Sequence, residues 1–186
     1  MALPTFDLES EILREHSKRQ CDNIATWVGN NPKRFDQLLQ LVLKGMPVVQ
    51  QRGSWPLSNV AIAHPELLTK SLEPLIANLQ TTGLHNGIKR HTMRILEDMA
   101  IPENVEGDVM NICFNFLQSP TEAIAVKAIC LTVLGKLARI YPEIIPEIKL
   151  LIEEDPHQTP ALKSRATKLL KTFSKSKRSL LKNTNG

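Results

Sequence analysis

Three stretches of the chain decide its fold: IKRHTMRILEDMA (88–100), VKAICLTVLGKLA (126–138) and LKSRATKLLKTFS (162–174). Each opens with an aliphatic residue followed by a lysine, and they recur at intervals of about 37 residues, a spacing typical of stacked helix pairs. Counted from the lysine, apolar residues fall in steps of three and four, so they share one face of a helix. The pattern therefore predicts equivalent helices that each bury one side.

A second set of amphipathic segments precedes these helices. Three of them begin at Pro32, Pro65 and Pro142, and another begins at Val105. Proline fits the first turn of a helix at little cost, so these positions are favourable helix starts. The connections within each pair are short and turn-like, as at 81–83 and 119–121. Short connections between consecutive helices predict antiparallel hairpins.

The paired pattern resembles the HEAT/armadillo class of helical repeats. A Leu-rich first helix, a turn and an apolar–Lys/Arg pair that opens the second helix carry the resemblance, which runs from residue 32 to residue 173 and is weakest over 32–63. It implies an all-α fold, a right-handed α-α superhelix of about four helix hairpins, with the second helices lining a concave face. Members of the class usually have Asp in the turn before the basic residue, whereas this chain has Gly83, Thr121 and His157.

The ends of the chain differ from the repeats. Residues 1–31 are expected to form a capping helix from Ser10 to Gly29 with Ser10 as N-cap, since a solenoid needs an atypical end to cover its last apolar face. Together with this cap, residues 32–174 form one repeat domain. The last segment, residues 175–186 (KSKRSLLKNTNG), is short and basic. It is expected to be a disordered tail.

The composition is that of an ordinary globular protein. Of 186 residues, 42% are hydrophobic and 4% aromatic, and 23 basic and 19 acidic residues give a net charge of +4. This mild excess permits an acidic protein or nucleic acid as partner and requires neither. Apolar runs are too short for a membrane span, and no secretory signal opens the chain. Cys21, Cys113 and Cys130 are expected as buried free thiols, so a cytoplasmic location is predicted.

Positions opposite the buried face of each second helix predict the concave surface. At about 100° per residue they form three groups, one per helix: Arg90, Arg94 and Glu97; Ala128, Thr132 and Gly135; Ser164, Lys168 and Lys171. The middle group lacks long side chains. Either a partner approaches the backbone at Gly135, or a crossing helix packs tightly there.

The recurring basic residues lie at the flank of these helices. This basic ladder comprises Arg52, Lys89, Lys127 and Lys163. A flank position favours a structural role, in which the stem covers apolar surface and the charged group meets polar groups of the next repeat. His91 lies on a similar flank among arginines, where a solvated or phosphate-facing imidazole is expected.

The segment QQRGSWPLSNVAIA (50–63) departs from the repeat. Gly53 and Pro56 stand inside a predicted helix, beside Trp55. Local rules broken in one repeat indicate a functional or strained site. The alternative is a turn at Gly53 and a restarted helix with Ser54 as its cap. On the first interpretation Trp55, Leu57 and Val60 supply apolar contacts to a partner.

No motif of catalysis, metal binding or nucleotide binding is present, so no enzyme activity, cofactor or metal is expected. The leading hypothesis is an interaction or scaffold protein whose concave face holds an acidic protein or peptide. The alternative is a nucleic-acid binder, because one family of alkylpurine DNA glycosylases has a similar architecture. A third hypothesis is a purely structural subunit. The sequence does not predict the oligomeric state under any of these three hypotheses.

Overall fold

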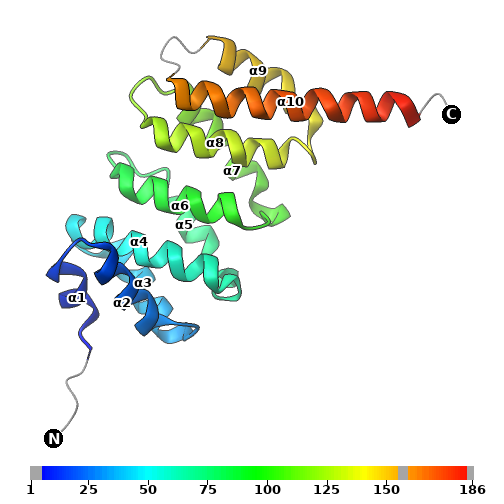
Figure 1. Cartoon of the computed structure of the whole chain (residues 1–186). Helices are drawn as coiled ribbons and strands as arrows, with labels where there is room; N and C mark the ends of the chain where they lie inside the picture. The colour runs from blue at the N-terminus through cyan, green and yellow to red at the C-terminus, as the bar shows by residue number, and fades with distance from the viewer. Residues whose placement is uncertain (1–5, 155–158, 184–186) are drawn as a thin grey trace, which may run out of the picture. The chain divides into compact units, whose positions relative to one another are not determined.

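The computed structural model describes residues 6–154 and 159–183, and helices without strands make up the regular structure of these ranges (Figure 1). The predicted all-α fold is thereby confirmed. The chain divides into two compact units, Met1–Ile101 and Pro102–Gly186. The single repeat domain expected over 32–174 is thus divided between the two, and each is described by itself.

The first unit contains α1 to α6. Their bounds are α1 Leu8–Arg14, α2 Lys18–Val28, α3 Pro32–Lys44, α4 Pro47–Ala63, the 3-10 helix η1 Pro65–Lys70, α5 Leu72–Asn78 and α6 Asn86–Asp98. Asn31 caps α3 by accepting hydrogen bonds from the backbone N–H groups of Lys33 and Arg34 at 3.1 and 3.2 Å. Pro32 follows in the first turn, as predicted.

The N-terminal cap is two helices, so the single helix expected from Ser10 to Gly29 was wrong. Glu15 and Ser17 have extended backbones, and the Ser17 hydroxyl accepts a hydrogen bond from the Gln20 N–H at 3.1 Å. This N-cap starts α2 and separates it from α1. Ser10 is not the N-cap of α1, because Asp7 occupies that position and accepts the Ser10 hydroxyl at 2.6 Å.

Helix α4 runs without a break through Gly53 and Pro56, so the alternative of a turn and restart at Ser54 was wrong. A Cβ on Gly53 would lie 3.1 Å from Val42 Cγ2 and 3.4 Å from Ile12 Cδ1. The glycine therefore lets α4 approach α1 and α3 closely. Pro56 is buried, and its missing N–H leaves the Arg52 carbonyl without its helical donor.

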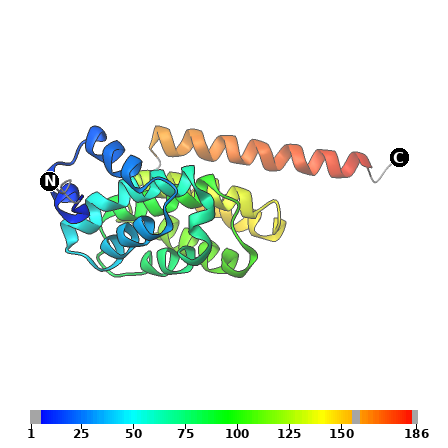
Figure 2. The same cartoon turned by 90° about the horizontal axis from the view of Figure 1, so that it is seen from below.

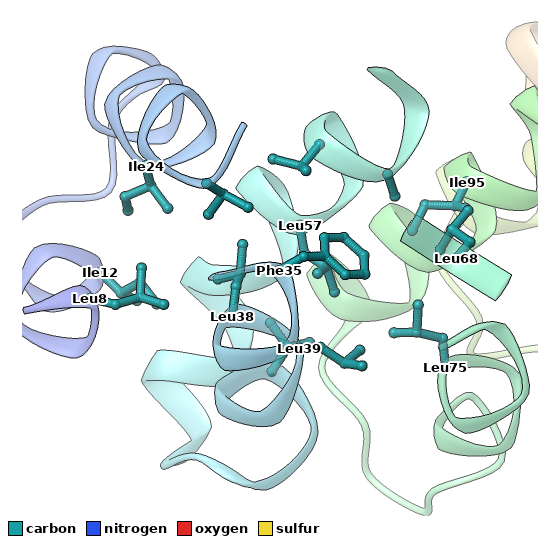
Figure 3. Packing of buried hydrophobic residues seen from close by; sticks show 14 of the residues in the cluster. Leu8, Ile12, Ile24, Phe35, Leu38, Leu39, Leu57, Leu68, Leu75 and Ile95 are labelled. Atoms are coloured by element: carbon teal, nitrogen blue, oxygen red, sulfur yellow. The ribbon is translucent and has the colours of Figure 1, made fainter. Parts of the chain in front are cut away.

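Helix α4 is the central element of this unit. It contacts α1, α2, α3, η1 and α6. Aliphatic side chains from all of these helices and from α5 meet around Phe35 and Leu57 (Figure 3). Burial of this cluster is the main source of stability for the unit.

The second unit contains α7 Glu103–Gln118, α8 Ile124–Leu137, the 3-10 helix η2 Pro142–Ile144, α9 Ile145–Glu154 and α10 Pro160–Asn183. Helix α8 packs against α7 on one side and α10 on another. Buried Glu106 of α7 accepts a hydrogen bond from the Tyr141 hydroxyl at 2.6 Å, which raises the pKa of Tyr141.

Helix α10 continues well beyond the predicted repeat. Its backbone is helical to Asn183, so most of the segment expected as a disordered tail is helix and its last part projects past the rest of the unit (Figure 2). Basic residues with few helix breakers are compatible with a long helix. Residues 184–186 and the turn residue His157 lie outside the described ranges.

Candidate partner-binding face

Arg90 and Arg94 are exposed on α6, as predicted, whereas Ile88, Ile95 and Leu96 of the same helix are buried. Glu97, one turn after Arg94, is half-buried and has an interaction of its own. Among the described residues, neither Arg90 nor Arg94 forms an ion pair. Two adjacent guanidinium groups are thus available on this side of α6.

Trp55 contacts α6 at His91, which lies between the two arginines in the sequence. Its half-buried ring stacks on His91 of α6, with ring centroids 6.1 Å apart and an angle of 9° between the planes. It also contacts exposed His16 edge-on, at 5.9 Å and 84°. Trp55 therefore connects α4 with α6 and with the segment between α1 and α2.

His91 is buried, so the expectation of a solvated or phosphate-facing imidazole was wrong. Its exposed fraction is 6%, and its Nδ1 has no hydrogen-bond partner in the described part of the chain. Burial first, and then the positive charges of Arg90, Arg94 and His16, lower the pKa of His91 to about 4. The imidazole is therefore neutral at neutral pH.

Helix α2 joins the same surface through Cys21. The Asn59 amide of α4 donates to the Cys21 Sγ at 3.3 Å, and Arg94 is close enough to influence the thiol. Burial and the charge of Asp22 nevertheless raise the pKa of Cys21 to about 12, so the thiol stays protonated. We call this surface the α2–α4–α6 face and define it by Trp55, Arg90 and Arg94, with His16, Cys21, Asn59 and His91 around them.

A family model described as a HEAT repeat domain matches residues 8–173. The chain is a HEAT repeat protein. No curated protein and no solved structure matches this HEAT repeat protein. HEAT repeats generally act as protein-interaction scaffolds and present extended surfaces built from successive helices.

Two predicted contact residues are not available to a partner. Leu57 and Val60 are each 2% exposed and belong to the buried cluster of the first unit. Because a helix turns about 100° per residue, Leu57 lies about 200° around α4 from Trp55 and faces the opposite way. This angle, which follows from the sequence spacing alone, could have predicted that Leu57 is buried when Trp55 faces the surface.

The four residues of the basic ladder differ in burial and in their contacts. The Arg52 guanidinium donates to the carbonyl of Leu13 at 2.7 Å, near the C-terminal end of α1, a preceding helix rather than the next repeat. Lys127 is buried, Lys89 is half-buried and Lys163 is exposed. Sequence reasoning missed Arg165, whose guanidinium donates to the Ala128 carbonyl at 3.0 Å and joins α10 to α8.

The predicted contact positions of the second unit are partly covered. Lys168 and Lys171 are exposed on α10, and Thr132 is half-buried with its hydroxyl donating to the Ala128 carbonyl at 3.4 Å. Gly135 is buried beneath Leu169 of α10. A crossing helix thus explains Gly135, and close approach of a partner there was the wrong alternative.

The described residues contain neither a metal-binding cluster nor a membrane-spanning helix. Within 6–154 and 159–183, no group of three or more His, Cys, Asp or Glu side chains is arranged to hold a metal ion. The helices of the same ranges include none that is long and apolar enough to cross a membrane.

Proposed function

We propose that this HEAT repeat protein is a non-catalytic scaffold in the cytoplasm that holds an acidic segment of a protein partner on the α2–α4–α6 face. The supporting observation is the exposed pair Arg90 and Arg94 beside half-buried Trp55. Arginine and tryptophan are the residue types that most often dominate the energy of protein interfaces.

The cations of α2 provide an informative contrast. Lys18 is paired with Asp22 and Arg19 with Glu15, each within one helical turn. These pairs hold their charges within the protein, whereas Arg90 and Arg94 have no such pairing among the described residues. A carboxylate from a partner would supply the missing counter-charge and accept bidentate hydrogen bonds from a guanidinium.

A protein partner is favoured over nucleic acid by the state of the two tryptophans. Single-stranded nucleic acid is usually held by bases stacked on open aromatic rings. Here Trp55 is already in ring contact with His91 and His16, and Trp27 stacks on Phe6 at 4.3 Å with the Arg34 guanidinium 4.6 Å from its ring centroid. Neither ring is a free stacking platform, although Lys168 and Lys171 could still contact phosphates.

The test is capture of partners from the native lysate with and without nuclease, using the wild type and the variant Arg90→Glu/Arg94→Glu. We expect a defined protein partner that survives nuclease treatment and is lost from the double variant, while helicity and thermal melting stay unchanged. The variant Lys168→Glu/Lys171→Glu is the matched control on the second unit and should retain the partner. If the arginine substitutions do not affect capture, the binding site lies elsewhere. If nuclease removes the captured molecules, the nucleic-acid alternative is favoured.

A further inference from the structure

The two arginines are placed to share a single anion. They stand four residues apart on α6, so their side chains leave the same side of the helix one turn apart. Both are exposed, and the positive charge of each lowers the pKa of the buried His91. A ligand that settles between them therefore meets a charge of about +2.

The acids of α2 and of the segment before it are engaged with other cations, whereas Asp98 at the end of α6 is exposed one turn beyond Arg94. Asp22 pairs with Lys18, Glu15 pairs with Arg19, and Glu97 has an interaction of its own. None of the ion pairs within the described residues joins an acid to Arg90 or Arg94, so an anion from another molecule can serve as their counter-charge.

A buried nitrogen next to the pair gives a second and independent indication. Only 6% of the surface of His91 is exposed, yet its Nδ1 lacks a hydrogen-bond partner in the described part of the chain. Buried polar atoms of native proteins nearly always have such a partner, so each exception requires an explanation, as does Asn78 Nδ2 elsewhere in the unit. This exception lies between Arg90 and Arg94 in the sequence, and its ring stacks on Trp55.

The charge of the pair distinguishes two kinds of acidic group. A carboxylate carries one negative charge and would neutralise only one arginine. A phosphate monoester carries about −1.5 to −2 at neutral pH and offers three acceptor oxygens, enough for both guanidinium groups. We propose that the α2–α4–α6 face recognises a phosphorylated serine or threonine in the partner segment, with its phosphate held between Arg90 and Arg94. This inference rests on the proposed function and narrows it to one class of partner.

The direct test is a nuclear magnetic resonance titration of the full chain with inorganic phosphate and, at equal ionic strength, with acetate. The reporters are the arginine Nε–H groups and the two indole N–H groups, of which Trp55 lies at the face and Trp27 serves as internal control. We expect saturable shifts at Arg90, Arg94 and Trp55 at concentrations at least about tenfold lower for phosphate than for acetate. Equal responses to the two anions, or shifts spread over all arginines, would overturn the proposal.

Variants and peptides then separate the sources of phosphate. Arg90→Gln and Arg94→Gln should each weaken phosphate binding, whereas Arg139→Gln, an exposed arginine of the second unit, should not. A peptide with one phosphoserine should bind more tightly than inorganic phosphate and than the same peptide with serine or aspartate. Binding of the phosphoserine peptide no tighter than that of inorganic phosphate would reject the peptide source.

Two further probes keep the inference distinct from the proposed function. If an acidic peptide rich in Asp and Glu binds the face and phosphorylation adds nothing, the phosphate inference fails and the proposed scaffold function stands. If neither peptide binds, both fail. Stronger competition by a thymidine oligonucleotide than by the phosphoserine peptide would reject the inference in favour of nucleic acid.

Discussion

Gly135 of α8 and Leu169 of α10 pack so closely that a Cβ on the glycine would overlap Leu169 Cδ1. No real Cβ is found so near another heavy atom, so any side chain at this position displaces the leucine. The atom in the way is the tip of a flexible, half-buried side chain, so an added methyl group would have to move Leu169 aside. Glycine within a helix costs about 1 kcal/mol relative to alanine, and close packing offsets that cost.

The substitution Gly135→Ala should therefore change the stability of the wild type little, because the cost of displacing the Leu169 side chain offsets the gain in helix propensity. In a Leu169→Ala background the same substitution should stabilise by about 1 kcal/mol, since only the propensity gain remains. Chemical denaturation of the four proteins measures this difference between the two backgrounds. Gly107→Ala is the matched control, because Gly107 is exposed in α7 with nothing within 4 Å of its added Cβ, and it should stabilise both backgrounds equally.

Substitution of Arg52 by methionine should lower the free energy of unfolding of the first unit by about 1 kcal/mol. The change keeps an apolar stem but removes the hydrogen bond to the Leu13 carbonyl, which ties α4 to the end of α1. Thermal unfolding of Arg52→Met measures the loss. Arg139→Met is the control for removal of an exposed arginine, and an equal effect of the two substitutions would show that the Leu13 contact contributes nothing.

The fold was largely predictable from the sequence because the regular spacing of apolar residues identifies each repeat. Steps of three and four around the recurring lysines located α6, α8 and the first half of α10 within a few residues. Prolines at 32, 65 and 142 marked true helix starts for the same reason, since their fixed φ suits the first turn.

The errors came from features whose meaning depends on tertiary neighbours. Glycine and proline inside α4 suggest a break when they are considered locally, but Val42 and Ile12 lie against Gly53 and stabilise an unbroken helix. Likewise His91 follows Arg90 in a polar stretch, and only the ring of Trp55 stacked on it reveals a buried position. Contacts between residues distant in sequence have no periodic signal, so the site was the least predictable part of the molecule.

His91 should make the first unit sensitive to acid. Its pKa is about 4 in the folded protein, lowered by burial and by Arg90, Arg94 and His16, against 6.5 for an ordinary histidine. The unfolded chain binds the proton more readily between these values, so stability is complete above pH 6.5 and is lost as pH falls towards 4. We expect about 2 kcal/mol less stability at pH 5 than at pH 7.5 from this residue.

Urea denaturation at the two pH values measures this contribution. His91→Gln is the matched control, because glutamine does not titrate, and its stability should fall less on acidification by about that amount. Arg94→Gln should give an intermediate result, since it removes one of the positive charges that lower the pKa of His91. An identical pH dependence for wild type and His91→Gln would exclude His91 as the source.

Leu57 and Trp55 should separate into a stability residue and a binding residue. Leu57→Ala should cost about 2 to 5 kcal/mol of stability, because it opens a cavity in the core of the first unit. Leu150→Ala, at an exposed leucine of α9, should cost far less and serves as its control. Trp55→Phe should instead reduce capture of the partner at nearly wild-type stability; unchanged capture would remove Trp55 from the proposed face.

The position of α4 at the centre of the first unit determines how that unit is expected to unfold. In an ideal solenoid each repeat touches only its neighbours, and melting can begin at one end and spread. Here α1, α2, α3, η1 and α6 all rest on one helix, so losing any of them uncovers part of the same surface. We expect the backbone amides of α4 to exchange with solvent deuterium last, and those of α2, α3 and α6 to become exposed in one concerted opening.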